Sequence, residues 1–433
     1  MMEKAWWFLL IGTLLTFIAL ARGPIRRLPM TGAMIYIAVG FAIGPAGSGL
    51  VATDLASRPG LLAVLAEIGL VVSLFSIGMH LRVPLRNALW LLPLRLGIPA
   101  MLVTIALLTG FSLVATGASI GVALFLAAVL APTDPVLANE LRVEHAGDDE
   151  PVRFALSGEG GLNDGTAYPF ALLGLALCGA HQAGISSGAT FAGVAVWGIV
   201  SAIGSGWLLA IVFVKAVFVL RTRYGEAIGL DGFLALGLMS AAYGVAIFIH
   251  VFGFVAVFAA GVALRHEELR ATGDKPPVEV LENMERGEKS DVAKDPERAH
   301  AYLAEAMMGF TLEMERIAEL SLMLVTGCVV SAHWREMIAW SAVLPALFLF
   351  FIARPLSVWL VMAGSQADRQ QRHLIGWMGI RGVGAFYYIA MGIDEAGEML
   401  RPLLPMVLDA ITLSVFLHGA TAGVALKRYL RNR

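Results

Sequence analysis

One short stretch of the chain concentrates polar residues within apolar surroundings: Ser157-Gly-Glu-Gly-Gly-Leu-Asn-Asp-Gly-Thr166. On a helix that turns about 100° per residue, Glu159 and Asn163 share one face, whereas Asp164 lies roughly 140° around from Glu159. The two carboxylates therefore need not share one partner. A carboxyl group in such a place is a candidate for reversible binding of a proton or a cation.

An arginine in a later apolar segment provides a counter-charge. Arg354 lies in Ala353-Arg-Pro355, and an ionised Glu159 at membrane depth needs a partner of this kind. If the two groups neutralise each other, Asp164 remains as the free acid of the stretch. A pair that only fixes helix packing and a pair with a direct part in transport are both compatible with the sequence.

Two prolines interrupt the apolar segment that ends in Val129-Leu-Ala-Pro-Thr-Asp-Pro-Val136. Pro132 and Pro135 cannot donate hydrogen bonds, so their spacing predicts unwound backbone near Thr133. At membrane depth such backbone is tolerated only where it is buried in protein or lines a wet cavity. The break also brings half-helix ends together, and Asp134 is suited to offset the positive end.

A second interruption is predicted at Gly379-Ile-Arg-Gly-Val-Gly384, where Arg381 is placed to face exposed carbonyl groups. Broken helices in two corresponding places are typical of secondary transporters, which bind their substrates where the breaks meet. The sequence therefore favours a transport site built from two broken helices and the polar stretch at Glu159 to Asp164.

These residues need a membrane-spanning frame, which the composition predicts. Of 433 residues, 58% are hydrophobic and 15% charged, an apolar share above the roughly 45–50% of soluble domains. The net charge of −2 argues against a nucleic-acid partner, and only two cysteines rule out a disulfide scaffold or a thiolate metal cluster. We predict an all-α polytopic membrane protein whose partner is membrane lipid.

Apolar stretches of about 20 residues, each long enough to cross the hydrocarbon layer, predict about thirteen transmembrane helices. Most of the 31 Lys and Arg residues fall in alternate connections, which places the N-terminus outside and the C-terminus in the cytoplasm. The breaks recur at the same place in two units of opposite direction, so we predict inverted repeats with crossed broken helices. The spans begin near Trp6, Thr31, Leu61, Leu94, Ala118, Val152, Ala192, Ile228, Val251, Glu319, Ile338, His373 and Leu404.

Three segments follow from this pattern. Residues 1–264 hold the first repeat, a linking helix and the start of the second repeat, and residues 317–433 hold the last spans and a short cytoplasmic tail. Between them, residues 265–316 are rich in charge and predict a solvated cytoplasmic linker. Its last part, Pro296 to Arg316, has the spacing of an amphipathic helix. Composition favours a connector over a regulatory element.

Taken together, the motifs resemble the monovalent cation:proton antiporter-1 family, the NhaP-type bacterial sodium/proton antiporters and their animal relatives. The resemblance covers nearly the whole membrane portion and implies an NhaA-like fold, an elevator-like mechanism, a homodimer and a role in pH homeostasis at the bacterial inner membrane. It rests on Thr133-Asp134-Pro135, Glu159 with Asn163-Asp164-Gly165, Arg354, the stretch around Arg381, and Ser414-Val-Phe-Leu-His-Gly419.

Carried onto this chain, the resemblance implies that Asp164 binds Na⁺ or a proton alternately and that its neighbour Asn163 stabilises the core. Thr133 would offer oxygen ligands. Asp134 would tune the half-helix ends, and Arg381 would compensate their charge. The pair Glu159–Arg354 would be structural.

The chain departs from the family pattern at one position, and it carries a further carboxylate that is similar to one in the family. Family members often carry Ser where this chain has Gly160, so a backbone carbonyl, a water, Thr133 or Ser157 would supply the missing ligand. Glu67, in Ala66-Glu67-Ile68, resembles a family carboxylate near the site. Alternatively, Glu67 simply lies near the outer membrane interface.

Charge counting predicts the stoichiometry. With Glu159 and Arg354 paired, one proton or one monovalent cation neutralises Asp164, so exchange would be electroneutral and would need no cofactor beyond the transported Na⁺ and H⁺. K⁺/H⁺ exchange and a sodium-coupled carrier of a small organic solute are alternatives. A channel would need a continuous path, and the motifs of intramembrane enzymes do not occur on adjacent spans.

Overall fold

The computed structural model describes residues 30–51, 57–134, 148–180, 188–273, 275–281 and 298–431, with isolated residues elsewhere. The first predicted span, which begins near Trp6, lies almost wholly outside the described residues, and so does most of the predicted linker between 282 and 297. The fold is therefore given from Thr31 onward.

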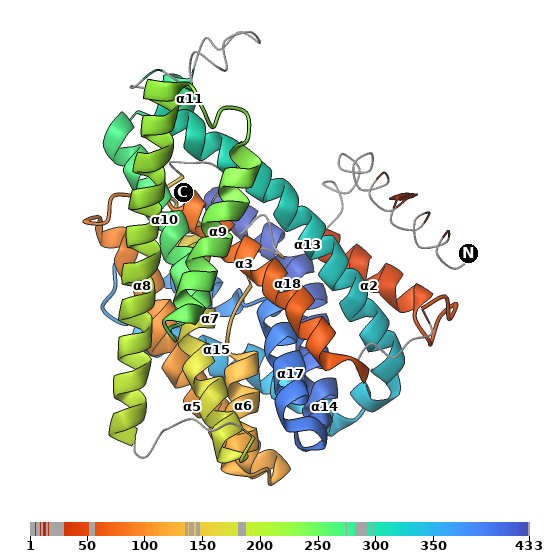
Figure 1. Ribbon diagram of the computed structural model, residues 1–433. Coiled ribbons are helices and arrows are strands. Elements are labelled where there is room, and N and C mark those ends of the chain that lie inside the picture. The colour runs from red at the N-terminus through yellow and green to blue at the C-terminus, as the bar shows by residue number, and fades with distance from the viewer. Residues whose placement is uncertain are drawn as a thin grey trace.

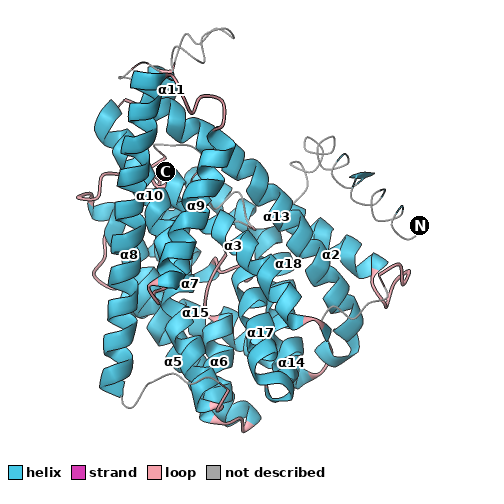
Figure 2. Cartoon of the chain, viewed as in Figure 1, coloured by secondary structure: helices cyan, strands magenta, loops and turns pink. Residues whose placement is uncertain are grey.

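Every element among the described residues is helical (Figure 2). Seven helices are long and apolar enough to cross a membrane, and two shorter helices, Gly32–Ile43 and Ile120–Leu130, are also apolar. Each predicted span from Thr31 onward coincides with a helix or with a pair of helices. The prediction of an all-α multi-pass membrane protein is confirmed.

In chain order the helices are α2 (Gly32–Ile43), α3 (Pro59–His80), α4 (Leu91–Arg95), α5 (Met101–Thr116), α6 (Ile120–Leu130), α7 (Pro151–Leu177), α8 (Gly188–Val219), α9 (Asp231–Phe248), α10 (Gly253–Thr272), α11 (Pro277–Val280), α13 (Ala299–Met337), α14 (Trp340–Phe348), α15 (Arg354–Val361), α16 (Arg369–Trp377), α17 (Val383–Ala396) and α18 (Leu404–Arg431).

Helix α13 is one continuous helix of 39 residues that crosses the molecule diagonally and packs along α2 and α3 (Figure 1). The predicted amphipathic helix and the span that follows it are thus parts of a single rigid element. Glycines allow the close packing. A Cβ on Gly40 of α2 or on Gly327 of α13 would lie 2.2 or 2.3 Å from a backbone oxygen of the other helix. Gly78 of α3 and Gly261 of α10 form a second reciprocal pair, each at 2.5 Å.

The solvated linker that composition predicts from Arg265 onward does not begin there. Helix α10 continues to Thr272, and Arg265 is fully buried within it. The guanidinium is tolerated because it is paired: it donates to Glu305 of α13 at 2.9 Å, to Glu268 at 3.4 Å and to the backbone oxygen of Met79 at 2.7 Å. Composition counts charges but does not show which of them are neutralised inside the protein.

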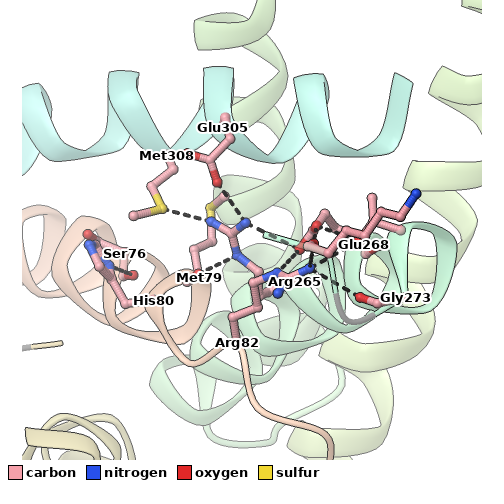
Figure 3. A network of polar contacts seen from close by, with 11 residues as sticks. Ser76, Met79, His80, Arg82, Arg265, Glu268, Gly273, Glu305 and Met308 are labelled. Carbon is pink, nitrogen blue, oxygen red and sulfur yellow. Dashed lines mark hydrogen bonds and ion pairs between the residues drawn. The ribbon is translucent and has the colours of Figure 1, made fainter. Parts of the chain in front are cut away.

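A second arginine completes this polar network. Arg82, which follows α3, donates to both oxygens of Glu268 at 2.9 and 3.2 Å and to the backbone oxygens of Gly273 and Lys275 at 3.3 and 2.7 Å. Figure 3 shows the guanidinium groups of Arg82 and Arg265 on either side of Glu268. Glu268 therefore links the end of α3 to α10, while Arg265 links α10 to α13.

We expect Glu268→Gln to destabilise the protein strongly, because it leaves two buried guanidinium groups without their shared carboxylate. Removing one partner of a buried ion pair costs about 3–5 kcal/mol, which would appear as a lower midpoint of thermal unfolding in detergent. Glu313→Gln is the matched control, because Glu313 forms an exposed pair with Arg316 at 2.6 Å. Equal midpoints for the two variants would contradict a stabilising role for the network.

Candidate functional site

The first helix interruption follows α6. The helix ends at Leu130, and residues 131–134 are not helical, because Pro132 has no N–H to continue the ladder. Asn163 of α7 donates from Nδ2 to the backbone oxygen of Thr133 at 3.0 Å and to its hydroxyl at 2.8 Å. The amide that precedes Asp164 thus holds the unwound backbone. Most of the chain between Asp134 and α7 lies outside the described residues.

The second interruption separates α16, which ends at Trp377, from α17, which begins at Val383. Arg381 lies between them and is fully buried. Its side chain donates to the backbone oxygen of Gly379 and, at 2.7 Å, to that of Leu130. Its backbone N–H donates to the hydroxyl of Ser414 in α18 at 2.9 Å. The guanidinium therefore meets the carbonyl ends of α6 and α16, where the helix dipoles are negative.

Direct hydrogen bonds join the two interruptions. The N–H of Asp134 donates to the backbone oxygen of Ile380 at 2.8 Å, and the N–H of Val383 donates to the Asp134 carboxylate at 3.1 Å. Asp134 thus lies at the N-terminal, positive end of α17. The structure therefore brings Thr133, Asp134 and Arg381, all predicted from sequence, into one cluster beside α7.

Asp164 lies within α7 and is 5% exposed. Its Oδ1 is 2.5 Å from the point where Gly384 would carry a Cβ, so it lies against the first turn of α17. Among the described residues this oxygen has no hydrogen-bond partner. Buried polar atoms in that state are rare, because desolvation is costly unless a ligand, ion or proton compensates it. Asp164 therefore has the capacity to take up a cation or a proton.

Glu159 and Arg354 form an ion pair in the same region. Arg354 Nη1 and Nη2 donate to the two oxygens of Glu159, with Nη2–Oε2 at 2.7 Å, and both side chains are almost fully buried. Arg354 also donates to the backbone oxygens of Ile375 and Met378 at 3.4 and 3.3 Å. The pair connects α7 and α15 to the end of α16, and the bidentate geometry is the strong form of this contact.

Glu67 lies on α3, and its carboxylate accepts a hydrogen bond from the hydroxyl of Tyr243 on α9. The Tyr243 ring contacts Phe254 with centroids 5.5 Å apart, and Phe254 contacts Tyr168 of α7 at 6.4 Å. This series of rings leads from Glu67 to the helix that carries Asp164. That Glu67 takes a direct part in cation binding stays a prediction.

Three residues at the site had no predicted role. The sequence indicates Ser414 only as part of a motif, whereas in the structure its hydroxyl accepts a hydrogen bond from the backbone N–H of Arg381. Gly384 and Tyr388 of α17 both contact Asp164: Tyr388 is fully buried, and its hydroxyl donates to the backbone oxygen of Asp164 at 2.7 Å. Gly384 and Tyr388 lie one helical turn apart on one face of α17, but only the packing of α17 against α7 shows that this face meets Asp164.

The fold and this site define a class of protein. Two helix interruptions joined by hydrogen bonds, beside a buried acid whose Oδ1 has no partner among the described residues, are typical of ion-coupled secondary transporters. The chain belongs to the sodium/hydrogen exchanger family, because the family model described as "Sodium/hydrogen exchanger, transmembrane" matches residues 12–428. The resemblance drawn from the motifs is thereby confirmed, and cation/proton exchange is the activity that the family supports.

Solved structures agree at the level of the fold. The chain is similar to the sodium proton antiporter MjNhaP1 from Methanocaldococcus jannaschii at pH 8, with a TM-score of 0.71, 20% identity, and coverage of 98% of this chain and 99% of that one. An electron-microscopy map of the same antiporter gives a TM-score of 0.69 and 19% identity over the same shares of each chain.

We expect Glu159→Gln and Arg354→Gln to lower the midpoint of thermal unfolding sharply, since each leaves one buried charge without its partner, at a cost of about 3–5 kcal/mol. The double variant Glu159→Leu/Arg354→Met removes both charges and should recover most of the loss. If the double variant were as unstable as the sum of the single ones, Glu159 and Arg354 would not act as a neutral pair.

Proposed function

We propose that the protein exchanges Na⁺ for H⁺ across the membrane and that Asp164 binds one or the other in turn. The contrast between two carboxylates on α7 carries this proposal. Glu159 is neutralised by Arg354, whereas the Oδ1 of Asp164 has no hydrogen-bond partner among the described residues. A buried acid of this kind binds whichever cation reaches it, and a proton and Na⁺ then compete for one place.

The same charges support electroneutral one-for-one exchange. Asn163 beside Asp164 is uncharged, and Glu159 is already paired. The remaining charges at the breaks, Asp134 and Arg381, are engaged with helix ends, and we propose that they compensate those ends and do not change their charge during transport. Replacing one proton by one monovalent cation at Asp164 then leaves the charge of the site unchanged.

The ligand that replaces the family serine at Gly160 is, in this proposal, Thr133. Its hydroxyl and backbone oxygen both accept from Asn163, so they lie within a hydrogen bond of the residue next to Asp164. Ser157 is less suited, because it lies about two turns before Asp164 on α7, roughly 10 Å away along the helix axis. Oxygen ligands from Thr133 together with the Asp164 carboxylate suit a hard monovalent cation such as Na⁺.

Alternating access would come from movement of one unit against another. We propose that α4 to α7 and α14 to α18 form a core that carries the site, and that the other helices form the scaffold of an elevator. The hydrogen bonds from Asp134 to Ile380 and from Val383 to Asp134 lie within this core and would move with it. Inverted repeats with crossed broken helices, the NhaA-like arrangement, belong to the same proposal. Glu67, on the scaffold helix α3, would then assist the cation on its way to Asp164.

The cellular setting is proposed from the sequence. An excess of Lys and Arg in alternate connections supports an extracellular N-terminus, a cytoplasmic C-terminus and a cytoplasmic segment within residues 265–316. We propose a homodimer in the lipid of the bacterial inner membrane, where sodium/proton exchange would serve pH homeostasis. Transported Na⁺ and H⁺ would be its only small-molecule ligands, without a cofactor.

Asp164→Asn should abolish exchange, because an amide carries no negative charge to attract the cation and takes up no proton in exchange for it. The measurement is quenching and recovery of a pH-sensitive dye in vesicles carrying a pH gradient, on addition of Na⁺, K⁺ or Li⁺. Asp394→Asn is the control, because Asp394 is an exposed aspartate of α17 and should leave the rate unchanged. Sodium-dependent proton movement by Asp164→Asn would sink the proposal.

Electroneutrality makes a separate prediction. The initial rate should be the same at zero membrane potential and at a potential clamped by K⁺ and valinomycin, because no net charge crosses in a cycle. A rate that follows the imposed potential would contradict one-for-one exchange. If an organic solute were required for sodium-dependent proton movement, the alternative of a sodium-coupled carrier would apply instead.

A further inference from the structure

Helix α17 presents two residues to Asp164 from one side. Gly384 and Tyr388 are four residues apart and therefore share a helix face. Gly384 meets the side chain of Asp164, and Tyr388 meets its backbone. The two contacts together fix where the carboxylate lies relative to the second interruption.

At Gly384 a side chain would fit only if the Asp164 carboxylate moved away from α17. A Cβ built there would lie 2.5 Å from Asp164 Oδ1, closer than real Cβ atoms come to another atom. Glycine thus lets the carboxylate lie against the first turn of α17. The amides of a first helical turn have no partner within the helix. The N–H of Val383 donates to the Asp134 carboxylate, and Asp164 Oδ1 lies against the next residue, Gly384.

At Tyr388 the contact fixes the backbone. The hydroxyl donates to the carbonyl oxygen of Asp164 at 2.7 Å, and the side chain is fully buried. Its ring lies among other aromatic rings, with the Tyr387 and Tyr168 centroids 5.2 and 6.3 Å away. A ring packed in this way has little freedom, so the hydroxyl holds α7 to α17 at the position of the candidate cation ligand.

We propose that Gly384 and Tyr388 are positioning residues that set the affinity of the site for its cation. Gly384 has no side chain, which leaves room for the Asp164 carboxylate at the positive end of α17. Tyr388 fixes the position of Asp164 along the axis of that helix. The cation then binds a carboxylate that α17 has already oriented. This inference rests on the proposed function, because it concerns how Asp164 binds the exchanged ion.

The test separates affinity from maximal rate in reconstituted vesicles. Gly384→Ala should raise the apparent KM for Na⁺ by about tenfold, because a displaced carboxylate would lose about 1.4 kcal/mol of binding free energy. Tyr388→Phe removes one hydrogen bond and keeps the ring, so KM should rise about three- to tenfold. In both variants the maximal rate should change by less than about threefold, because the moving units remain the same.

Two matched controls keep the test specific. Gly376→Ala adds a methyl group at the other half of the same broken helix, where its nearest neighbour would be at an ordinary 3.5 Å. Tyr429→Phe removes a hydroxyl that bonds Gln371 and Glu150 at 2.9 and 3.1 Å, away from Asp164. Both should keep the KM of the unchanged protein.

The outcomes are distinct. If the unchanged protein shows no sodium-dependent proton movement, the proposed function fails and this inference fails with it. If the unchanged protein exchanges and both Gly384→Ala and Tyr388→Phe keep its KM, the inference alone is overturned. If Gly384→Ala does not fold, Tyr388→Phe decides the test. A second measurement for this variant is the rise of its thermal unfolding midpoint in detergent as Na⁺ is added. If the rise needs a higher Na⁺ concentration than in the unchanged protein, the role of Tyr388 is supported; if the dependence on Na⁺ is the same, it is refuted.

Discussion

The two helix breaks leave backbone carbonyl and N–H groups without partners inside a helix. These buried groups need other hydrogen-bond partners, and the rest of the site depends on the side chains that supply them. Arg381 binds the carbonyl ends of α6 and α16, and Asp134 accepts from the N–H that opens α17. Asn163 holds the Thr133 backbone. Arg381 and Asn163 are buried and Asp134 is half-buried. A buried polar side chain without a partner is costly, so the breaks and these side chains stabilise one another.

Because the other charges at the breaks have partners, Asp164 is the carboxylate that we propose for the ion. Glu159 has Arg354, and Asp134 and Arg381 are occupied by helix ends. Asp164 shares α7 with Glu159 but lies on a different side of it, against α17 instead of α15. In the proposed mechanism, structural charge and exchangeable charge are thus on different sides of a single helix, and the site would change its ligand without losing the contacts that hold the breaks.

Much of this could be predicted from the sequence, for physical reasons. Prolines at 132 and 135 cannot continue a helix, and an arginine such as Arg354 within an apolar span needs an acid, so the break and the pairing follow from local chemistry. Recurring apolar stretches of about 20 residues also predict the multi-pass frame, because helices of that length cross the hydrocarbon layer with their backbone groups satisfied.

The rest depends on three-dimensional packing that spacing does not report. The close approach of Gly384 to Asp164 depends on the orientation of α7 against α17, and the hydrogen bond from Tyr243 to Glu67 depends on which helix lies beside α3. A run of charged residues predicts a solvated linker at Arg265, whereas in the structure Glu268 and Glu305 neutralise its charge. Ion pairs between distant segments are invisible to composition.

The central claim is that a cation and a proton compete for the Asp164 carboxylate. Calorimetric titration of the purified protein with Na⁺ in buffers of different ionisation enthalpy measures the protons released as the cation binds. At a pH where Asp164 is protonated, the account predicts about one proton released for each Na⁺ bound, with neither binding nor release in Asp164→Asn. Sodium binding without proton release, or unchanged release in Asp164→Asn, would contradict it.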